Sequence, residues 1–486
     1  MKLIGATMDA RRTMAGTLLG ALAAALLPIG FQAAATADAT AYPDNLEPGK
    51  QGETMPGEAK VLDHPYSKGV RLIGNTKVAD VAGGTMAWAD ACAYIPGNAG
   101  VNVIDVRDPR GPKVVGLLTE KGAVGAIETV HAITTPGRKL LAASVYGVQG
   151  PKMGGPGQDF KPGDAMVAVY DVSDCVKPKL VLEYAWPARV HTIRLSPNGR
   201  RLYGTLISPF TGEGGIQVLD ISDLKNPRFV GKFGATRPDG TTFEFAPHEV
   251  TVSPDERRIY AGVISSQGDD LNKGIKIFPP NRDGLGPEAG GIYIFDNSDI
   301  AEGKPNPKMR LIGTSQHGGW HTAMQAKING VPYLVGSGEL LPCPGTWPRI
   351  SNIADERNPH VVGYFRLEMN YPENCPPPPV GNNGITSPPG TATIHWSDVD
   401  DASDTRLGLF SMTWAGLRLV DLRNPAKAVE VGYFKPGDSC MTHTRYVKET
   451  GQIWFGCQQS GFYVIELKSD LRKSLGFPAL RNGEAT

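Results

Sequence analysis

The chain has 486 residues and carries 49 basic and 49 acidic side chains, so its formal net charge is zero. This balance excludes the strongly basic surface that binding to nucleic acid or to anionic membranes requires. The 60 glycines and 40 prolines predict short strands joined by many turns, and the hydrophobic fraction of 41% is enough for a sizeable core.

The chain begins with a targeting segment. A basic start and an apolar run within residues 1–31 are followed by the small-residue stretch "QAAATADA", which offers cleavage sites. We therefore expect a signal peptide over residues 1–39 and a linker over 40–64. We also expect a periplasmic or secreted mature protein without a membrane anchor. The pair Arg11 and Arg12 keeps twin-arginine export open beside general secretion.

A repeated phrase follows and predicts the fold. Its copies begin at residues 103, 169, 218, 294, 350, 419 and 464, as in "VIDVRDPRGPKVVG", "VLDISDLKNPRFVGKF" and "LVDLRNPAKAVEVGYF". Each copy is typical of a strand, a turn with Asp, Asn or Pro, and a second strand. Seven such hairpins, with further hairpins between them, predict an all-β chain folded as a seven-bladed β-propeller. We expect the propeller over residues 65–475 and a tail over 476–486.

The seventh copy, "VIELKSD", lacks its last strand. The stretch "GVRLIGN" at residues 69–75 resembles "KMRLIGT" at residues 308–314, which is the fourth-strand text of another blade. We therefore expect an N-terminal strand to close the last blade, which removes the open sheet edges that a propeller would otherwise expose. An array of β-sandwiches is the alternative fold, and it explains the sevenfold phrase poorly.

The phrases "VIDVRDP", "VLDISDLKNP" and "LVDLRNP" resemble those of the LVIVD-repeat propeller family, and more distantly those of the selenium-binding protein and methanethiol oxidase group. The resemblance covers nearly the whole mature chain. It implies the propeller fold and, through methanethiol oxidase, it implies copper. It is weak for function, because one fold hosts many unrelated activities.

Six of the nine histidines stand at the start of an innermost strand, one in each of six blades. They are His131, His191, His248, His321, His395 and His443. Because the innermost strands line the central channel, we expect these imidazoles to converge near one mouth. Neutral imidazole suits Fe, Cu, Ni or Zn, so the pattern predicts a transition-metal site. The resemblance to methanethiol oxidase favours copper for this site, with iron second. A set of hydrogen-bonding caps and a metal-free anion or ligand site are the alternatives.

Two glutamates precede these histidines in loops at the channel mouth. Glu128 lies three residues before His131, and Glu244 lies four residues before His248. Both are candidate catalytic residues that would orient a ligand or move a proton, and solvated loop residues are the alternative. Glu249 follows His248 directly, so in an extended strand it points away from the face of that histidine.

Long segments interrupt the repeat at residues 147–165, 266–291, 336–348 and 368–390. From the order of strands in a blade, we expect all four at the mouth that holds the histidines. We expect only tight turns such as "SPNG" at the other mouth. Loops that carry function gather in this way on one side of a rigid scaffold, so the arrangement predicts a covered pocket.

The six cysteines of an exported protein permit three disulfides. The sequence does not fix their pairing. Cys440 with Cys457 and Cys343 with Cys375 are candidate pairs, because the members of each lie near the mouth that holds the histidines. Cys92 and Cys175 have no assigned partner, and if they are free we expect them to be buried.

Together these observations predict an exported metal-dependent oxidoreductase of the oxidase or oxygenase type, which acts on a small organic molecule at the channel mouth. Iron is supported by analogy with carotenoid-cleaving propellers. The sequence contains no serine nucleophile elbow, phosphate-binding loop or dinucleotide fingerprint. A non-enzymatic propeller that binds a protein or a glycan is the alternative function.

Overall fold

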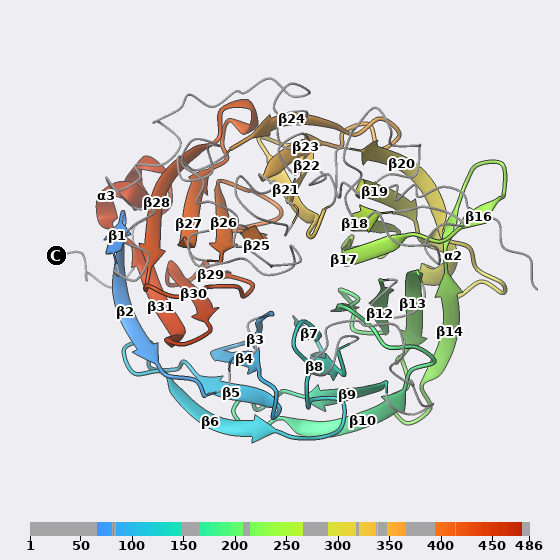
Figure 1. The fold of residues 1–486 in the computed structure, drawn as a ribbon, viewed down its shortest axis with the longest axis horizontal. Coiled ribbons are helices and arrows are strands. Elements are labelled where there is room, and N and C mark those ends of the chain that lie inside the picture. Colours follow the sequence, from blue (N-terminus) through green and yellow to red (C-terminus); the bar gives the residue numbers. More distant parts are fainter. Residues whose placement is uncertain are drawn as a thin grey trace, which may run out of the picture.

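The computed structural model describes residues 66–79, 81, 84–146, 165–207, 214–265, 290–316, 320–336, 338, 348–365, 394–413 and 415–478. The predicted signal peptide and linker, nearly all of the four insertions, and the cysteines at 343 and 375 lie outside the described residues. Seven small sheets stand around a central channel as the blades of a propeller (Figure 1). The predicted seven-bladed all-β fold is confirmed.

The blades follow one another along the chain, and each runs from an innermost to an outermost strand. Blade I contains β3 (Ala87–Ala89), β4 (Cys92–Pro96), β5 (Val101–Asp105) and β6 (Lys113–Leu118). Blade II contains β7 (Val130–Thr135), β8 (Arg138–Ser144), β9 (Met166–Asp171) and β10 (Lys179–Ala185). Blade III contains β11 (Ile193–Leu195), β12 (Arg201–Leu206), β13 (Gly215–Asp220) and β14 (Arg228–Phe233).

The later blades keep the same order. Blade IV contains β17 (Ala246–Val252), β18 (Arg258–Ser265), β19 (Gly291–Asp296) and β20 (Arg310–Gln316), and is extended at its outer edge by β15 (Ala235–Thr236) and β16 (Thr242–Phe243). Blade V contains β21 (Met324–Ile328), β22 (Val331–Gly336), β23 (Arg349–Asn352) and β24 (His360–Tyr364). Blade VI contains β25 (Ile394–Val399), β26 (Leu407–Met412), β27 (Gly416–Asp421) and β28 (Val429–Lys435). Blade VII contains β29 (Arg445–Val447), β30 (Gln452–Cys457), β31 (Gly461–Leu467) and β2 (Val70–Thr76).

Helical segments are short and lie between strands or after the last one. They are α2 (Ser298–Ala301), the 3-10 turn η6 (Pro425–Lys427) and α3 (Ser469–Ser474). Among the described residues, no helix has the length and apolar character needed to cross a bilayer.

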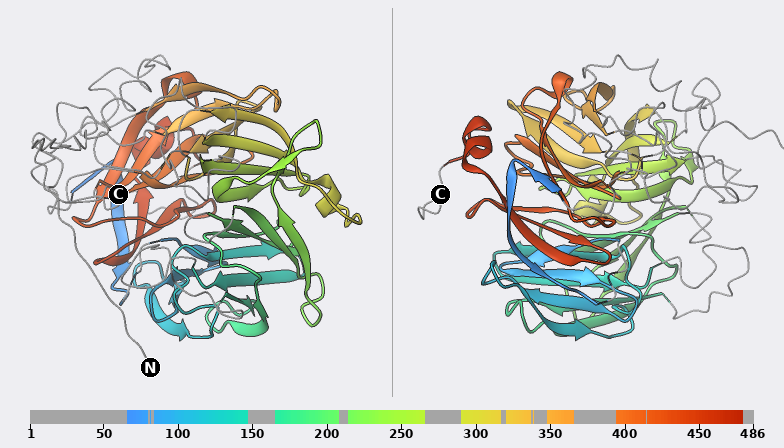
Figure 2. Two further views of the ribbon diagram at one scale, coloured as in Figure 1. Left: turned by 45° about the vertical axis from the view of Figure 1, so that its right-hand side comes forward. Right: turned by 60° about the vertical axis from the view of Figure 1, so that its left-hand side comes forward.

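The N-terminal segment closes the propeller as predicted. β2 pairs antiparallel with β31, from Val70 opposite Leu467 to Thr76 opposite Phe462. β1 (Tyr66–Lys68) pairs instead with β28 of blade VI. Figure 2 shows this segment, in blue, against the red strands of the last two blades. One segment from the start of the chain therefore completes blade VII and ties it to blade VI, so the edge of the last blade is not left open.

Apolar residues of the second and third strands form the core between neighbouring blades. The strands β12 and β26 are buried along their whole length, whereas the outermost strand β6 is largely exposed. Between blades III and IV, the aromatic side chains of Tyr203, Phe245 and Phe295 are fully buried. Because large aromatic side chains contribute most to such interfaces, this packing fixes the inner strands around the channel.

Two disulfides link cysteines of the described part of the chain. Cys440 pairs with Cys457 within blade VII, as expected. Cys92 of blade I pairs with Cys175, in the turn after β9 of blade II, which the sequence had left without a partner. One bridge therefore acts within a blade, and the other joins two neighbouring blades.

Glycines in the outermost strands let the turns of the next blade approach the backbone. A Cβ atom on Gly74 would lie 2.2 Å from the carbonyl oxygen of Pro109 in blade I. A Cβ atom on Gly313 would lie 2.2 Å from the carbonyl oxygen of Glu356 in blade V. Both distances are far shorter than van der Waals contact, and the atoms met are backbone. The spacing of the blades at the rim therefore requires glycine at these two positions.

We expect Gly74→Ala to lower the free energy of unfolding by about 1–3 kcal/mol, because β2 or the blade I turn must shift to make room. Gly111→Ala is the matched control, since its Cβ atom would meet only Asp108 Oδ2, at 3.6 Å. Chemical denaturation measures both variants. Equal unfolding midpoints for the two would contradict the close approach at Gly74.

Candidate metal centre

Strand pairing places the seven innermost strands in a common register. In blade III, Arg194 pairs with Tyr203, which pairs with Val218 at the start of the phrase "VLD". The same series of pairings identifies the equivalent residue in every other blade. These residues, here called the lower row, are Ala87, His131, Arg194, Thr251, Met324, Asp398 and Arg445.

Three residues before each member of the lower row lies a member of a second set, the upper row. Its members are Gly84, Glu128, His191, His248, His321, His395 and Thr442. His131 belongs to the lower row, and His443 lies one residue after the upper row. The structure therefore brings four of the six predicted histidines together with Glu128, and it places the other two at different levels of the channel.

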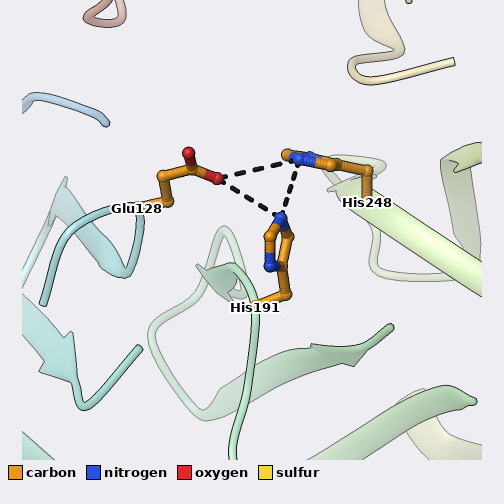
Figure 3. Close-up of side chains that lie close together, drawn as sticks. All are labelled: Glu128, His191 and His248. Atoms are coloured by element: carbon orange, nitrogen blue, oxygen red, sulfur yellow. Dashed lines mark hydrogen bonds and ion pairs between the residues drawn. The ribbon is translucent and has the colours of Figure 1, made fainter. Parts of the chain in front are cut away.

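Glu128, His191 and His248 meet inside the channel (Figure 3). The Nε2 atoms of the two histidines are 2.7 Å apart. Glu128 Oε2 lies 3.4 Å from Nε2 of His191 and 3.7 Å from Nε2 of His248. All three side chains are buried. Their ligand atoms therefore form a compact triangle that is shielded from solvent.

His321 and His395 lie on the other side of Glu128. His395 Nε2 is 3.3 Å from Glu128 Oε1, and the ligand atoms of Glu128, His321 and His395 lie within 4.8 Å of one another. The rings of His248 and His321 are in contact, with centroids 3.5 Å apart. The four histidines and Glu128 thus form one group, which we call the histidine–glutamate cluster.

The protonation states within the cluster suit metal ligation. His395 Nδ1 lies 2.7 Å from the carbonyl oxygen of Met441. Nδ1 therefore carries the proton and donates it there, while Nε2 keeps a lone pair toward Glu128. Burial, together with the neighbouring imidazoles, holds the pKa of His248 and of His321 well below the usual range. Both rings are therefore neutral, which is the form that binds a metal.

Within each of two triads that share Glu128, namely Glu128–His191–His248 and Glu128–His321–His395, the spacing of the ligand atoms suits an ion of a first-row metal. Two donors bound at a right angle, each roughly 2.1 Å from the ion, are about 3 Å apart, and opposite donors are about 4.2 Å apart. The measured separations of 2.7, 3.3, 3.4 and 3.7 Å lie close to or between these two values. Four imidazoles and one carboxylate are a donor set for a transition metal, whereas calcium takes oxygen ligands.

Trp396 bounds the cluster on the side of the lower row. Its side chain is buried, and its Nε1 donates a hydrogen bond to the carbonyl oxygen of Gly84. The indole centroid lies 4.6 Å from the ring of His321 and 4.0 Å from the ring of His443. The indole therefore separates the cluster from His443 and the groups beyond it.

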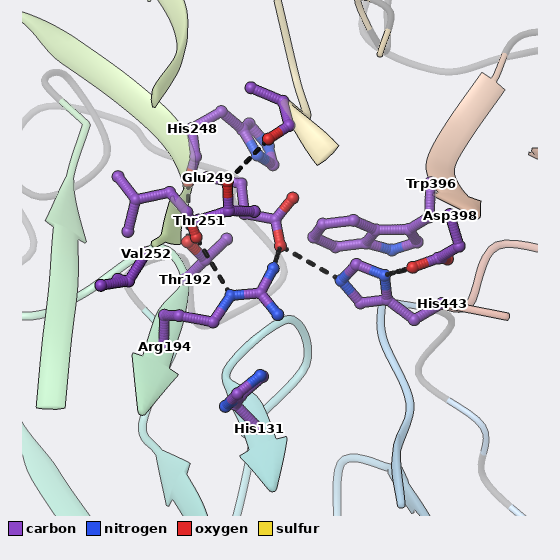
Figure 4. A network of polar contacts seen from close by, with 12 residues as sticks. His131, Thr192, Arg194, His248, Glu249, Thr251, Val252, Trp396, Asp398 and His443 are labelled. Carbon is purple, nitrogen blue, oxygen red and sulfur yellow. Dashed lines mark hydrogen bonds and ion pairs between the residues drawn. The ribbon is translucent and has the colours of Figure 1, made fainter. Parts of the chain in front are cut away.

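On the far side of Trp396, His443 is held between two carboxylates (Figure 4). Its Nδ1 donates to Asp398 Oδ1 at 2.9 Å, and its Nε2 lies 3.3 Å from Oε1 of Glu249. Arg194 Nη2 donates to the same oxygen of Glu249. Although burial opposes the charged form, the two carboxylates raise the pKa of His443 to about 9. His443 is therefore a cation at neutral pH, and a cation is not a metal ligand.

Two predicted site residues lie apart from the cluster. His131 accepts a hydrogen bond at Nδ1 from the backbone N–H of Leu195, 3.1 Å away, and lines a cavity beyond Trp396. The side chain of Glu244 is 46% exposed, and its carboxylate lies 3.6 Å from Lys232 Nζ. Within the described part of the chain, neither His131 nor Glu244 joins the four histidines.

Sequence reasoning missed Glu249, Asp398 and Arg194. Glu249 does point away from the face of His248, and it thereby reaches Arg194 and His443. A signal was available, because "HEVTV", "HWSDV" and "HTIRL" each place a charged residue in an otherwise buried strand. Buried charges are costly unless they are paired, so such residues in facing strands predict a paired network.

Comparison with known proteins assigns no family to this chain. No protein-family model and no curated protein matches it, so the resemblance to the LVIVD-repeat family stays a prediction. Among solved structures, the chain is similar to hydrazine synthase of Kuenenia stuttgartiensis, at 13% sequence identity and a TM-score of 0.49. The match covers 80% of this chain and 97% of that one. This likeness is too distant to carry an inference about function.

The charged state of His443 makes stability depend on pH. Its folded-state pKa of about 9 lies above the reference value of 6.5. His443 therefore stabilises the fold fully below pH 6.5, by roughly 3 kcal/mol, and this contribution is lost as the pH rises through 9. We expect the free energy of unfolding of the wild type to exceed that of His443→Gln most at about pH 6, and less at each higher pH. Denaturant titrations across this range measure the margin, and a constant margin would contradict a charged His443.

Proposed function

We propose that the histidine–glutamate cluster binds one transition-metal ion, and that the protein is an exported metal-dependent oxidoreductase acting on a small organic molecule. The supporting observation is that four buried histidines form two triads of ligand atoms that share the carboxylate of Glu128. His191 Nε2 and His248 Nε2, 2.7 Å apart, share one proton in a hydrogen bond, and loss of that proton would leave two lone pairs that face one cation. A bound cation would take the place of this shared proton, whereas a set of hydrogen-bonding caps would bond separately to backbone groups.

Iron and copper are the ions that this donor set supports for redox chemistry. Imidazole suits Fe, Cu, Ni and Zn, while a carboxylate among the ligands favours a harder ion. The resemblance to methanethiol oxidase implies copper. Glu128, which takes the place of a fifth histidine, moves the balance toward iron. Either ion would supply electron transfer when bound.

The surrounding residues orient the ligands and limit access. The carbonyl oxygen of Met441 holds the proton of His395 away from the cluster. Trp396 covers the side of the lower row. We therefore place the entry of substrate at the opposite mouth, where the sequence predicts the long insertions. That substrate is a small molecule, aromatic or containing sulfur.

Metal analysis of the purified mature protein tests this proposal. We expect one equivalent of iron or copper per chain, and at least a tenfold loss in Glu128→Gln and in His248→Ala, because each change removes a ligand atom. His360→Ala is the matched control, since His360 is an exposed histidine on β24. A reversible change of oxidation state, followed by electron paramagnetic resonance, would support the redox assignment.

Three results would contradict the proposal. Metal-free protein, with stability unchanged in the variants, would favour the alternative of a propeller that binds a protein or a glycan. Stoichiometric zinc would exclude a redox role. Two ions per chain would mean that Glu128 bridges a pair of metals, which overturns the assignment of a single ion.

The disulfide Cys440–Cys457 holds the backbone that orients His395. Met441, whose carbonyl oxygen accepts the proton of His395 Nδ1, follows Cys440 directly in the chain. The bridge attaches this segment to the end of β30. The second bridge, Cys92–Cys175, joins blades I and II and does not hold a residue that contacts the cluster.

We expect the double variant Cys440→Ser, Cys457→Ser to bind the metal roughly 10–100-fold more weakly, because the segment that carries the Met441 carbonyl group loses its covalent anchor and keeps only backbone hydrogen bonds. The double variant Cys92→Ser, Cys175→Ser is the control, and we expect it to keep its metal affinity. Competition with a chelator measures both. Equal affinities in the two double variants would rule out a positioning role for Cys440–Cys457.

A further inference from the structure

The cavity that His131 lines opens at the mouth of the channel on the far side of Trp396 from the histidine–glutamate cluster. It measures about 400 Å³, and residues of the lower row such as His131, Arg194 and Met324 line it. Pro197, from the turn "SPNG", is also part of its wall, which identifies this mouth as the one with tight turns. The volume lies within the range of small-molecule sites.

The carboxylates of this cavity are already engaged by the protein. Asp398 accepts hydrogen bonds from His443 and from a backbone N–H group. Glu249, just inside the channel, accepts from Arg194. Asp400 Oδ1 accepts from two backbone N–H groups, at 3.0 and 2.9 Å. Asp398 and Asp400, the two carboxylates that line the cavity, thus already accept hydrogen bonds from the protein.

Two hydrogen-bond donors at the cavity, in contrast, are not used by the part of the protein that the structure describes. His131 accepts the N–H of Leu195 at Nδ1, so its proton resides on Nε2. Arg194 donates a hydrogen bond from Nε to the carbonyl oxygen of Val250, at 3.0 Å, and another from Nη2 to Glu249. Among the described residues, neither His131 Nε2 nor Arg194 Nη1 has a hydrogen-bond partner. Figure 4 shows the ring of His131 beneath the guanidinium group of Arg194, so the two donors lie on one side of the cavity.

Much of the remaining wall is apolar, and it includes Met86, Ile133, Val252, Met324 and Val399. A small inorganic anion would accept hydrogen bonds from both donors but would leave the apolar wall exposed to water. An organic acid would also remove this apolar wall from water, which is favourable. We propose that this mouth binds a small organic carboxylate, whose oxygens accept hydrogen bonds from Arg194 and His131. The body of the molecule packs against the apolar wall. The proposal does not depend on a metal in the histidine–glutamate cluster.

Titration calorimetry of the full mature chain with benzoate tests the proposal. We expect one saturable site, and at least tenfold weaker binding in His131→Asn. Asparagine keeps an acceptor for the N–H of Leu195 and lacks the donor at Nε2, so the variant removes only the proposed contact. His360→Asn is the matched control, because it makes the same change at an exposed histidine. Met324→Trp fills the cavity, and we expect it to abolish binding by a route independent of His131.

Three outcomes would overturn the proposal. These are the absence of saturable benzoate binding, equal affinity of His131→Asn and wild type, and equally tight binding of inorganic phosphate, which would show that the apolar wall contributes nothing. Glu128→Gln separates this site from the metal centre. We expect that variant to lose metal and to bind benzoate like the wild type. Loss of benzoate binding in it would place the probe on the metal and would also refute the proposal.

Discussion

The hydrogen-bonded pairing between the innermost and second strands of each blade is the constraint on which the site depends. It determines which residue of a strand faces which level of the channel, and a shift of one residue would exchange the faces of the strand. In blade II, the pairing of His131 with Ala142 carries Glu128 to the level of His191. A carboxylate therefore enters the cluster in blade II, and the histidine of that blade faces the other mouth.

One residue type is held in two opposite charge states within this channel. Imidazoles that face one another repel when protonated, so burial and mutual proximity keep His248 and His321 neutral. Beyond the indole of Trp396, His443 has Asp398 and Glu249 as partners and becomes a cation. The partners, more than the depth of burial, therefore decide which histidines are available to a metal. The buried indole of Trp396 separates the neutral histidines of the cluster from the ion-paired His443.

The fold was predictable because the repeated phrase records the same strand pairing seven times, and because the N-terminal segment carries the text of the missing strand. The site was predictable only in part. His131 lies six positions before Gly137 of its turn, whereas His191 lies eight positions before Gly199. This difference in spacing indicates that His131 is closer to the turn at the end of its strand. His443 is also eight positions from its turn glycine. Its one-residue shift follows from the pairing of Arg445 with Trp454, which no spacing reveals.

The residues that directly follow the upper row show how seven similar blades give the two ends of the channel different side chains. Four blades carry threonine there, at Thr85, Thr129, Thr192 and Thr322. Thr192 shows the structural use of this residue, since its hydroxyl donates to the carbonyl oxygen of His248 in the next blade, at 2.8 Å. The other three blades carry Glu249, Trp396 and His443, which form the barrier and the paired network. Departures from the common residue thus occur where the channel changes from the histidine–glutamate cluster to the paired network around His443.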